Sequence, residues 1–327
     1  MQILRWGLLS TAHINRKIIP AIRAARRSKL VAVSSRSELK SSQYAAEWNI
    51  PLSFGSYEAM LASPDIDAVY ISLPNHLHAE WTIKALQAGK HVLCEKPLAL
   101  TLDEVDQMTN AAQASGKVLS EAFMYRFNPQ TKVIGEWVHS GRIGELRQIH
   151  GWFSFLLTDT NNVRLVPEWG GGSIWDIGVY PISYAQFLTG SAPDWVAGRQ
   201  SLGPTGIDIT FSGTLHYPKD IVAQIHSSFA LPHSTVMQVF GSEGSLTIDY
   251  PFTGMDLHPR FKFTDTHGKE HTIKTPKGNL YRCEIEGMED NILDAAPPIV
   301  TLAESRNHIR TVLALLESAR TLQAVHL

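Results

Sequence analysis

Short apolar runs alternate with amphipathic segments over the first 121 residues, and this alternation constrains the fold more than any other feature. Five apolar runs have the length of a strand and end in turn residues: 3–9, 30–34, 68–73, 92–94 and 118–121. Four helical patterns lie between them: 14–25, 38–48, 79–88 and 102–115. Strands and helices that alternate with short connections are typical of a parallel, doubly wound sheet. The sequence therefore predicts an α/β domain over residues 1–121.

From residue 122 onward the pattern changes. One helix, at about 128–140, leads into long strand-like runs: 146–155, 207–217, 221–229, 235–240 and 244–249. Turn residues around 217–220 and 241–244 indicate hairpins, and two helices close the chain at about 279–293 and 302–323. Consecutive strands without helices between them favour an antiparallel sheet. We therefore expect a second, α+β domain over residues 122–327.

Composition narrows the class of protein. The 327 residues carry a formal net charge of -2, whereas proteins that bind nucleic acid usually show a strong basic excess. No apolar run approaches the ~20 residues of a membrane helix, and the chain opens on a strand rather than on a signal peptide. Cys94 and Cys283 offer neither a disulfide framework nor metal-ligand spacing. We expect a cytoplasmic protein without bound metal, nucleic acid or membrane partner.

The strand at 92–94 ends abruptly in Glu95-Lys96-Pro97. Proline has no N–H and a fixed φ, so a central strand cannot continue past Lys96. The ammonium group of Lys96 is therefore placed at the carboxyl end of a strand, which is where ligands bind in open α/β sheets. Taken alone, the tripeptide is explained better by a strand end with a surface Glu–Lys pair, so the rest of the chain has to support a functional role.

The first turn, Ser10-Thr11-Ala12-His13-Ile14, lies between a strand and a helix, where a dinucleotide fold places its phosphate loop. The usual fingerprint is G-x-G-x-x-G/A. Here its three positions fall on Ser10, Ala12 and Asn15, which are small but are not glycines. The alternative is an ordinary strand–turn–helix.

The second strand is followed by Ser35 and Arg36, with Lys40 one helical turn later. NAD sites usually carry an acid here, about 20 residues past the loop, to accept hydrogen bonds from the ribose. Hydroxyl and basic groups instead suit a 2′-phosphate, which an acid would repel. If the fold binds a dinucleotide, the sequence favours NADP over NAD.

The third strand ends at Leu73-Pro74-Asn75, and His78 follows three residues later. Because parallel strands end at one edge, this segment is expected to face the same crevice as the first turn and Lys96. A plain turn with a helix cap at Asn75 is the alternative.

In the second domain, Asn162-x-Arg164 precedes three glycines, 170–172, and a helix start at Ser173. Asp176 and Tyr180 are four residues apart and so share one face of a regular helix. Glycine-rich backbone beside an arginine, an acid and a tyrosine suits a polyhydroxylated ligand, because it combines close approach with directional hydrogen bonds. The alternatives are a capping box formed by Ser173 and Asp176, and a half-buried structural tyrosine.

Five motifs follow one another over nearly the whole chain: the opening strand–turn–helix, Pro74-Asn75-x-x-His78, Glu95-Lys96-Pro97, Tyr125-Arg126-Phe127-Asn128-Pro129 and the segment from Gly170 to Tyr180. In this order and spacing they resemble the glucose-fructose oxidoreductase and inositol dehydrogenase (Gfo/Idh/MocA) family of NAD(P)-dependent enzymes. The resemblance implies an N-terminal Rossmann domain and a C-terminal domain with a large, open-faced, mostly antiparallel sheet. It also implies homodimers or homotetramers formed through that sheet.

The resemblance implies that Lys96 and Tyr180 are catalytic. We expect Tyr180 to accept the substrate proton with its pKa lowered by Lys96, and Asp176 to orient Lys96 or a sugar hydroxyl. Arg126 and Arg164 are further candidates for positioning the substrate. The cofactor is expected to contact these residues: Ser10, Thr11, Ala12, His13, Ile14, Ser35, Arg36, Lys40, Leu73, Pro74, Asn75, His78, Glu95, Lys96 and Pro97.

Many family members carry histidine where this chain has Tyr180. Tyrosine there is similar to the branch that holds glucose-fructose oxidoreductase, NADP-dependent xylose dehydrogenases and dimeric dihydrodiol dehydrogenases. We therefore predict an NADP-dependent oxidoreductase acting on a cyclic sugar or polyol, such as xylose or glucose oxidised at C1. The alternatives are a trans-dihydrodiol dehydrogenase and a non-catalytic NADP-binding sensor.

Overall fold

The computed structural model describes residues 2–254 and 256–327, and their contacts divide the chain into two compact units. The first unit comprises Met1–Phe127 and Asn279–Ser305, and the second comprises Asn128–Gly278 and Arg306–Leu327. The sequence placed one boundary after residue 121 and assigned everything beyond it to the second domain. In the structure, the segment 279–305 instead belongs with the first unit.

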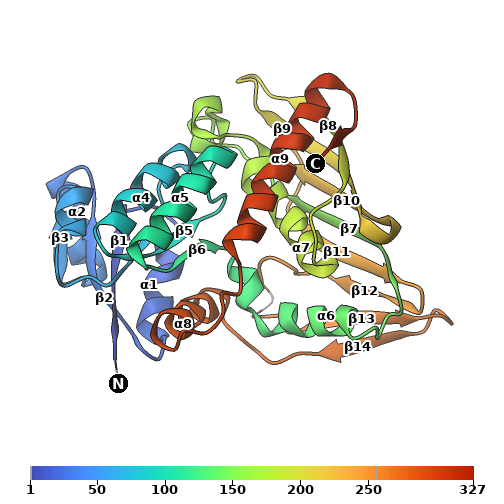
Figure 1. Cartoon of the computed structure of the whole chain (residues 1–327), viewed down its shortest axis with the longest axis horizontal. Coiled ribbons are helices and arrows are strands. Elements are labelled where there is room, and N and C mark those ends of the chain that lie inside the picture. Colours follow the sequence, from blue (N-terminus) through green and yellow to red (C-terminus); the bar gives the residue numbers. More distant parts are fainter. Residues whose placement is uncertain (1, 255) are drawn as a thin grey trace. The chain divides into compact units, whose positions relative to one another are not determined.

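The first unit is built on a parallel sheet with the strand order β3-β2-β1-β4-β5-β6 (Figure 1). Its strands are β1 (Leu4–Leu9), β2 (Ser28–Ser34), β3 (Leu52–Phe54), β4 (Ala68–Ile71), β5 (His91–Glu95) and β6 (Leu119–Ala122). Each neighbouring pair runs parallel. This order is that of a dinucleotide-binding fold, whose ligand crevice lies outside the carboxyl ends of the strands where the order reverses, here between β1 and β4. The predicted fold class is confirmed.

Helices connect these strands at the predicted places: α1 (Asn15–Ala24), α2 (Glu38–Trp48), α4 (His78–Gln87) and α5 (Leu102–Ser115). The start of α5 has a capping box, in which Thr101 and Glu104 exchange side-chain and backbone hydrogen bonds. The sequence missed β3 and α3 (Tyr57–Leu61), because three and five residues are too short to show a period. Short η1 (Asn75–Leu77) and η2 (Met124–Phe127) follow β4 and β6.

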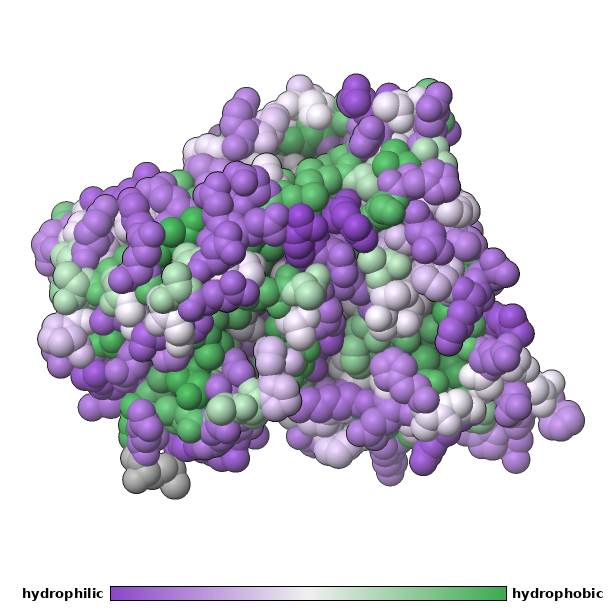
Figure 2. All heavy atoms as spheres, in the orientation of Figure 1, coloured by the Kyte–Doolittle hydropathy of each residue, from purple (hydrophilic) through white to green (hydrophobic). Residues whose placement is uncertain are grey.

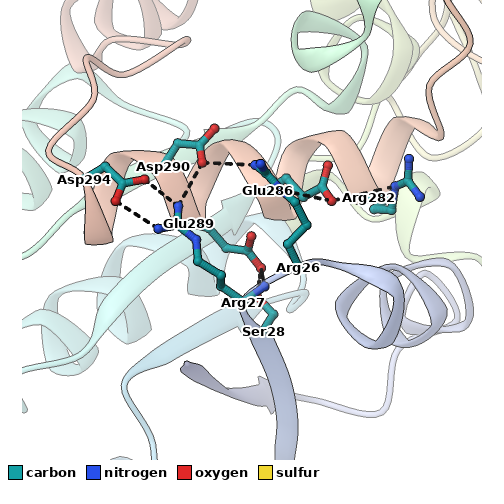
Figure 3. Close-up of polar contacts among 8 residues, drawn as sticks. All are labelled: Arg26, Arg27, Ser28, Arg282, Glu286, Glu289, Asp290 and Asp294. Carbon is teal, nitrogen blue, oxygen red and sulfur yellow. Dashed lines mark hydrogen bonds and ion pairs between the residues drawn. The ribbon is translucent and has the colours of Figure 1, made fainter. Parts of the chain in front are cut away.

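Helix α8 (Leu280–Leu293) completes the first unit. Its Ile285 and Met288 are buried in the same apolar cluster as Trp6 and Ile18. Its acidic side chains meet the arginines that precede β2 (Figure 3): Arg26 with Glu286 and Asp290, and Arg27 with Asp290 and Asp294. Buried Glu289 also accepts hydrogen bonds from the Arg27 N–H and the Ser28 hydroxyl. Both burial and charge therefore explain why 279–305 is part of this unit.

The second unit is built on a sheet with the order β14-β13-β12-β11-β7-β10-β9-β8-β15. Its strands are β7 (Leu146–Ser154), β8 (Trp195–Leu202), β9 (Asp208–Tyr217), β10 (Ile221–Ser228), β11 (Ser234–Gly241), β12 (Gly244–Ile248), β13 (Arg260–Asp265), β14 (Glu270–Lys274) and β15 (Val325–His326). Strands β7 and β10 are parallel, and the other neighbours are antiparallel. Both predicted hairpins are present, between β9 and β10 and between β11 and β12.

Helices pack on one face of this sheet. They are α6 (Pro129–His139), α7 (Val179–Thr189) and α9 (Leu302–Thr321), with the short helices η3 (Val163–Leu165), η4 (Pro167–Trp169), η5 (Ile174–Gly178) and η6 (Pro218–Asp220) in the connections. Along β7 the buried Ile149 and Phe153 alternate with His150 and Trp152, so the second pair points to the opposite face. There, side chains of β7–β10 line a groove of about 600 Å³.

Within residues 2–254 and 256–327, no helix has the length and apolarity that crossing a membrane requires. Hydrophilic residues are spread over the face of the molecule shown in Figure 2, and hydrophobic residues form smaller groups between them.

Candidate active site

The turn that carries Lys96 is held by its neighbours. Strand β5 ends at Glu95, whose carboxylate accepts a hydrogen bond from the buried Tyr70 hydroxyl. On the other side of Lys96, the Leu98 N–H donates to Glu121 at 2.9 Å. Lys96 itself is half-buried. Because the backbone is held on both sides, the origin of the Lys96 side chain is fixed at the carboxyl edge of the sheet.

His78 joins the ends of two strands. It is fully buried, with Nδ1 2.8 Å from the Pro97 carbonyl oxygen and Nε2 2.8 Å from the Leu73 carbonyl oxygen. Burial lowers the pKa of His78, and the charge of Lys96 adds to that effect. With both nitrogens facing backbone carbonyls, His78 braces the β4 and β5 ends and is not placed to accept a substrate proton.

A buried acid on α8 lies close to Glu95. Glu284 is 1% exposed, and burial together with the charge of Glu95 raises the pKa of Glu284 well above its usual value. Burial and the same Glu95 carboxylate raise the pKa of Tyr70. Sequence reasoning missed Glu284, because an acid inside a helical pattern looks like part of a solvated face.

Hydroxyl and amide groups replace the glycines of the phosphate loop. Ser10 adopts φ 128°, a region that favours glycine, and its hydroxyl lies 2.9 Å from the Ser72 hydroxyl and accepts from the Ala12 N–H at 3.1 Å. Asn15 donates to the Ser10 carbonyl oxygen and accepts from Ser72, each at 2.8 Å. These contacts hold the loop in a glycine-like conformation at the N-terminus of α1, which fits a bound pyrophosphate.

The end of β2 fits a 2′-phosphate. Ser35 is buried, whereas Arg36 and Lys40 are exposed. Burial raises the pKa of Tyr57, and the Arg36 guanidinium opposes that rise by its charge and by a hydrogen bond, so Arg36 is held beside Tyr57. A fixed guanidinium at this point can pair with a phosphate group of the ribose.

The glycine-rich segment of the second unit brings Arg164 and Asp176 together. Arg164 Nε donates to Asp176 Oδ2 at 2.6 Å, and the Asp176 side chain is 13% exposed. Asn162 caps η3 by accepting from the Arg164 N–H at 3.1 Å. The capping-box alternative is not what forms, because the Ser173 hydroxyl donates to Asp208 instead.

Asp176 lies in a π-helical turn, Ile174–Gly178, which runs directly into α7. The regular α-helical face expected for Asp176 and Tyr180 is therefore interrupted. Pro181 supplies a local reason, because it has no N–H to donate to the carbonyl of Ile177. Insertions of this kind occur frequently at functional sites.

Tyr180 is 6% exposed, and its ring is fixed among aromatic side chains. The ring centroids of Phe153 and Phe252 lie 5.5 and 5.3 Å from that of Tyr180. The phenol is therefore held in one orientation by packing from β7 and from the segment after β12.

Arg126 is placed differently from the expectation of a substrate contact. It is 5% exposed, pairs with Glu304 at 3.1 Å and donates to the Ile299 carbonyl oxygen at 3.1 Å. This geometry favours a role in holding the segment that leads into α9.

The predicted site residues thus form two sets, one within each unit. The first turn, the β2 and β4 ends and the Lys96 turn lie at the carboxyl edge of one parallel sheet. Arg164, Asp176 and Tyr180 lie around the start of α7.

A parallel sheet with this strand order, a phosphate loop after β1 and a lysine at a strand end define an oxidoreductase that binds a nicotinamide dinucleotide. The family model of the oxidoreductase family with an NAD-binding Rossmann fold matches residues 4–123. The model of the GFO/IDH/MocA C-terminal domain matches residues 131–247. The chain belongs to the GFO/IDH/MocA family of oxidoreductases.

Named relatives extend over the whole chain. D-xylose 1-dehydrogenase (NADP(+)) 2 of Haloferax volcanii is 37% identical over 99% of this chain and 100% of its own. The trans-1,2-dihydrobenzene-1,2-diol dehydrogenase of Bos taurus is 28% identical over 92% of each chain. The suspected family and branch are confirmed, and NADP, the expected cofactor, is the one named for the Haloferax enzyme.

Solved structures agree in fold. The aldose-aldose oxidoreductase of Caulobacter crescentus, complexed with glycerol, is 26% identical with a TM-score of 0.91 and full coverage of both chains. A 3-ketoreductase of Actinomadura kijaniata, in complex with NADP and TDP-benzene, is 26% identical with a TM-score of 0.89 and covers 97% of this chain and 98% of its own.

Proposed function

We propose that this protein is an NADP-dependent dehydrogenase that oxidises a cyclic sugar or polyol, with an aldopyranose such as xylose or glucose oxidised at C1 as the favoured reaction. The observation that carries the proposal is the Arg164–Asp176 pair, which lies one turn before Tyr180 in the chain. A charged pair at a glycine-rich turn suits a ligand with several hydroxyls, because it combines directional hydrogen bonds with close approach. The identity of the Haloferax enzyme over the whole chain supports the same substrate class.

In this proposal Tyr180 and Lys96 are the catalytic pair. When bound, NADP supplies the acceptor for the hydride that leaves the substrate carbon. In its ionised form, which the Lys96 ammonium stabilises because a free phenol with a pKa of ~10 is a weak acid, Tyr180 accepts the proton of the hydroxyl on that carbon and becomes a neutral phenol. Asp176, oriented by Arg164, holds a neighbouring hydroxyl.

Solved variants of the Actinomadura ketoreductase support this pair. They replace a tyrosine and a lysine that are as far apart in that chain as Tyr180 and Lys96 are here.

A panel of substrates tests the proposal. Reduction of NADP by the purified protein is measured with xylose, glucose and a cyclic trans-diol. We expect turnover with an aldose to exceed turnover with the diol. A preference for the diol would favour the dihydrodiol dehydrogenase reaction, which the 28% identity to the bovine enzyme keeps as the second candidate. Bound NADP without turnover on any member of the panel would favour the sensor.

Cofactor choice is tested separately. Arg36→Ala should weaken NADP binding much more than NAD binding, because only NADP carries the phosphate that Arg36 would meet. Fluorescence titration measures both affinities, and Arg147→Ala in the second unit is the matched control. Equal weakening of the two cofactors, or tighter binding of NAD by the starting protein, would contradict the assignment.

We also propose that two copies pair through the groove on the sheet of the second unit. The strands there present His150, Trp152, Arg199 and His226 on the face opposite α7 and α9. An aromatic side chain among hydrogen-bonding groups is a composition common at subunit contacts. Sedimentation at micromolar concentration should show a dimer or tetramer of the 36.3 kDa chain, and Trp152→Glu should reduce it to monomers. A monomer in the unaltered protein would refute this proposal.

A cytoplasmic location stays a prediction from the sequence.

A further inference from the structure

A buried acid lies under the start of the helix that carries the proposed active-site residues of the second unit. Asp208, the first residue of β9, is 4% exposed. Its Oδ2 accepts from the Ser173 hydroxyl at 2.6 Å and from the Ile174 N–H at 2.8 Å. The helix start is therefore tied to the sheet by a carboxylate that accepts from side chain and backbone together.

Two further contacts extend this tie. The Ser173 hydroxyl lies 2.8 Å from the Ser227 hydroxyl on β10, and both serines are fully buried. Gly172 has φ +124°, and a Cβ built on it would lie 2.1 Å from Asp208 Oδ1. The second carboxylate oxygen thus fills the space that a side chain at position 172 would need. The chain approaches Asp208 so closely that only glycine fits.

The contact between Asp208 and Ser173 lies about one helical turn before the proposed active-site residues. Asp176 follows Ser173 by three residues, and the π-helical turn that contains Asp176 leads directly to Tyr180. Pro181 has no N–H to donate to the carbonyl of Ile177, so the anchor at Ser173 and Ile174 adds to a first turn whose backbone hydrogen bonding is interrupted. A shift of the anchored end would be passed to both side chains.

We infer that Asp208 is a positioning residue for Asp176 and Tyr180, acting through Ser173 and the Ile174 N–H. Asp208 takes no part in proton transfer in this role. Its role is to set where the π-helical turn begins, so that the phenol of Tyr180 and the carboxylate of Asp176 point in the orientation that the reaction needs.

The test uses the full-length protein with NADP. Asp208→Ala removes the carboxylate, Asp208→Asn keeps one acceptor oxygen, and Ser173→Ala removes a single hydrogen bond. We expect Asp208→Ala to lower turnover with the best aldose by roughly 100-fold, because a misplacement of about 1 Å can cost about 100-fold. Asp208→Asn should lower it less, and Ser173→Ala by only a few-fold. The affinity for NADP should change by less than twofold, since the expected cofactor contacts are all in the other unit.

A second variant approaches the same contact from the other side. Gly172→Ala should reproduce the loss seen with Asp208→Ala, because its methyl group would displace the carboxylate. Gly190→Ala, at the far end of α7, also has positive φ but meets no atom within 4 Å, and it should keep near-normal turnover. Gly190→Ala therefore shows the cost of an alanine at a positive-φ glycine next to α7 when no neighbouring atom has to move.

The inference rests on the proposed function only in its activity readout. Hydrogen exchange supplies the other readout: Asp208→Asn should speed exchange of the amides between 173 and 180 and leave β7 and β10 unchanged. If the unaltered protein turns over no aldose or diol, the proposed function fails, and exchange alone decides the role of Asp208. Unchanged exchange and unchanged turnover in a folded Asp208→Asn would overturn the inference. The inference would also be overturned if Asp208→Asn lowered the turnover of Tyr180→Phe by as large a factor as it lowers the turnover of the unaltered protein.

Discussion

Lys96 and Tyr180 are both held in place by buried polar groups, but those groups come from different distances along the chain. The Lys96 turn is braced by His78 and Glu121, which lie 19 and 23 residues from their partners. The start of the Tyr180 helix is tied to Asp208 and Ser227, which lie 35 and 54 residues from Ser173. The first site therefore depends on adjacent strand–helix units, and the second on how a sheet of distant strands assembles.

This difference between the two units shows which residues of a site the strand order alone can bring together. In a parallel sheet every strand ends at one edge, so a residue that follows a strand is already close to residues that follow its neighbours. Nothing comparable brings a helix start to a defined point on a mostly antiparallel sheet. There a specific anchor has to be present, and Asp208 supplies it.

The largest expected effect is on the proposed catalytic pair, Lys96 and Tyr180. Tyr180→Phe and Lys96→Met should each lower turnover by at least ~100-fold while NADP still binds, because removing a general base typically costs ~100- to 10,000-fold. Steady-state kinetics and a cofactor titration measure the two quantities. Tyr250→Phe and Lys277→Met serve as matched controls on exposed residues.

The losses of this pair should not add in the double variant, since the two residues act as a unit. Near-normal turnover of Tyr180→Phe at alkaline pH would show that another group accepts the proton. His78 is excluded from that role by its two carbonyl contacts.

Much of this arrangement could be predicted from the sequence. Glu95-Lys96-Pro97 and the alternation of strands and helices predicted the fold and the place of Lys96, because proline ends a strand whatever surrounds it. Tyr180 and Asp176 could be named from their motif, but the π-helical turn between them could not, since it depends on Pro181 and on an anchor 35 residues away. Asp208 was missed because an acid at the start of a strand looks like a turn residue. Helix α8 was assigned to the wrong unit because periodicity does not show what a helix packs against.

The second prediction concerns the pH dependence of the Asp208 anchor. Burial raises the pKa of Asp208 to about 6, although the hydrogen bonds from Ser173 and Ile174 oppose the rise. Because the pKa of Asp208 is higher in the folded state, the protonated acid contributes stability that is fully present below the ordinary pKa of 3.8. This contribution is lost as the pH rises through about 6. Asp208→Asn does not titrate.

The free energy of unfolding of Asp208→Asn, relative to the unaltered protein, should therefore rise by about 2 kcal/mol between pH 4.5 and 7.5. Urea denaturation at the two pH values measures this change. Asp220→Asn, which is exposed, is the control and should show no such trend. A difference that does not vary with pH would mean that Asp208 has an ordinary pKa.

The third prediction tests the brace at the other site. His78→Leu removes the ring N–H, so one of the buried carbonyl oxygens of Leu73 and Pro97 loses its donor and the free energy of unfolding should fall by about 2 kcal/mol. His78→Gln can still donate to one of them and should lose less. Denaturant titration measures both, with His267→Leu on an exposed loop as the control. Equal losses for leucine and glutamine would show that His78 matters for packing rather than for its hydrogen bonds.

The smallest effect is expected where polar contacts are exposed. Arg27→Ala breaks the pairs with Asp290 and Asp294 shown in Figure 3, and it should lower Tm by about 1–2 °C in dilute buffer. The difference should shrink in 0.5 M salt, because ions screen exposed charges. Arg147→Ala is the control, since its partner Glu145 is two residues away. A loss that high salt leaves unchanged would indicate that the Arg27 stem contributes by packing.

Because α8 belongs to the first unit but follows most of the second unit in the chain, the first unit cannot finish folding until α8 has been synthesised. Ile285 and Met288 complete the apolar cluster around Trp6 and Ile18, yet they leave the ribosome after nearly the whole of the second unit. At ~5–20 residues per second, the first six strands wait roughly 10–30 s for the helix that covers them. A fragment that stops at Phe127 would expose that cluster permanently. We expect such a fragment to aggregate unless residues 279–305 are supplied with it.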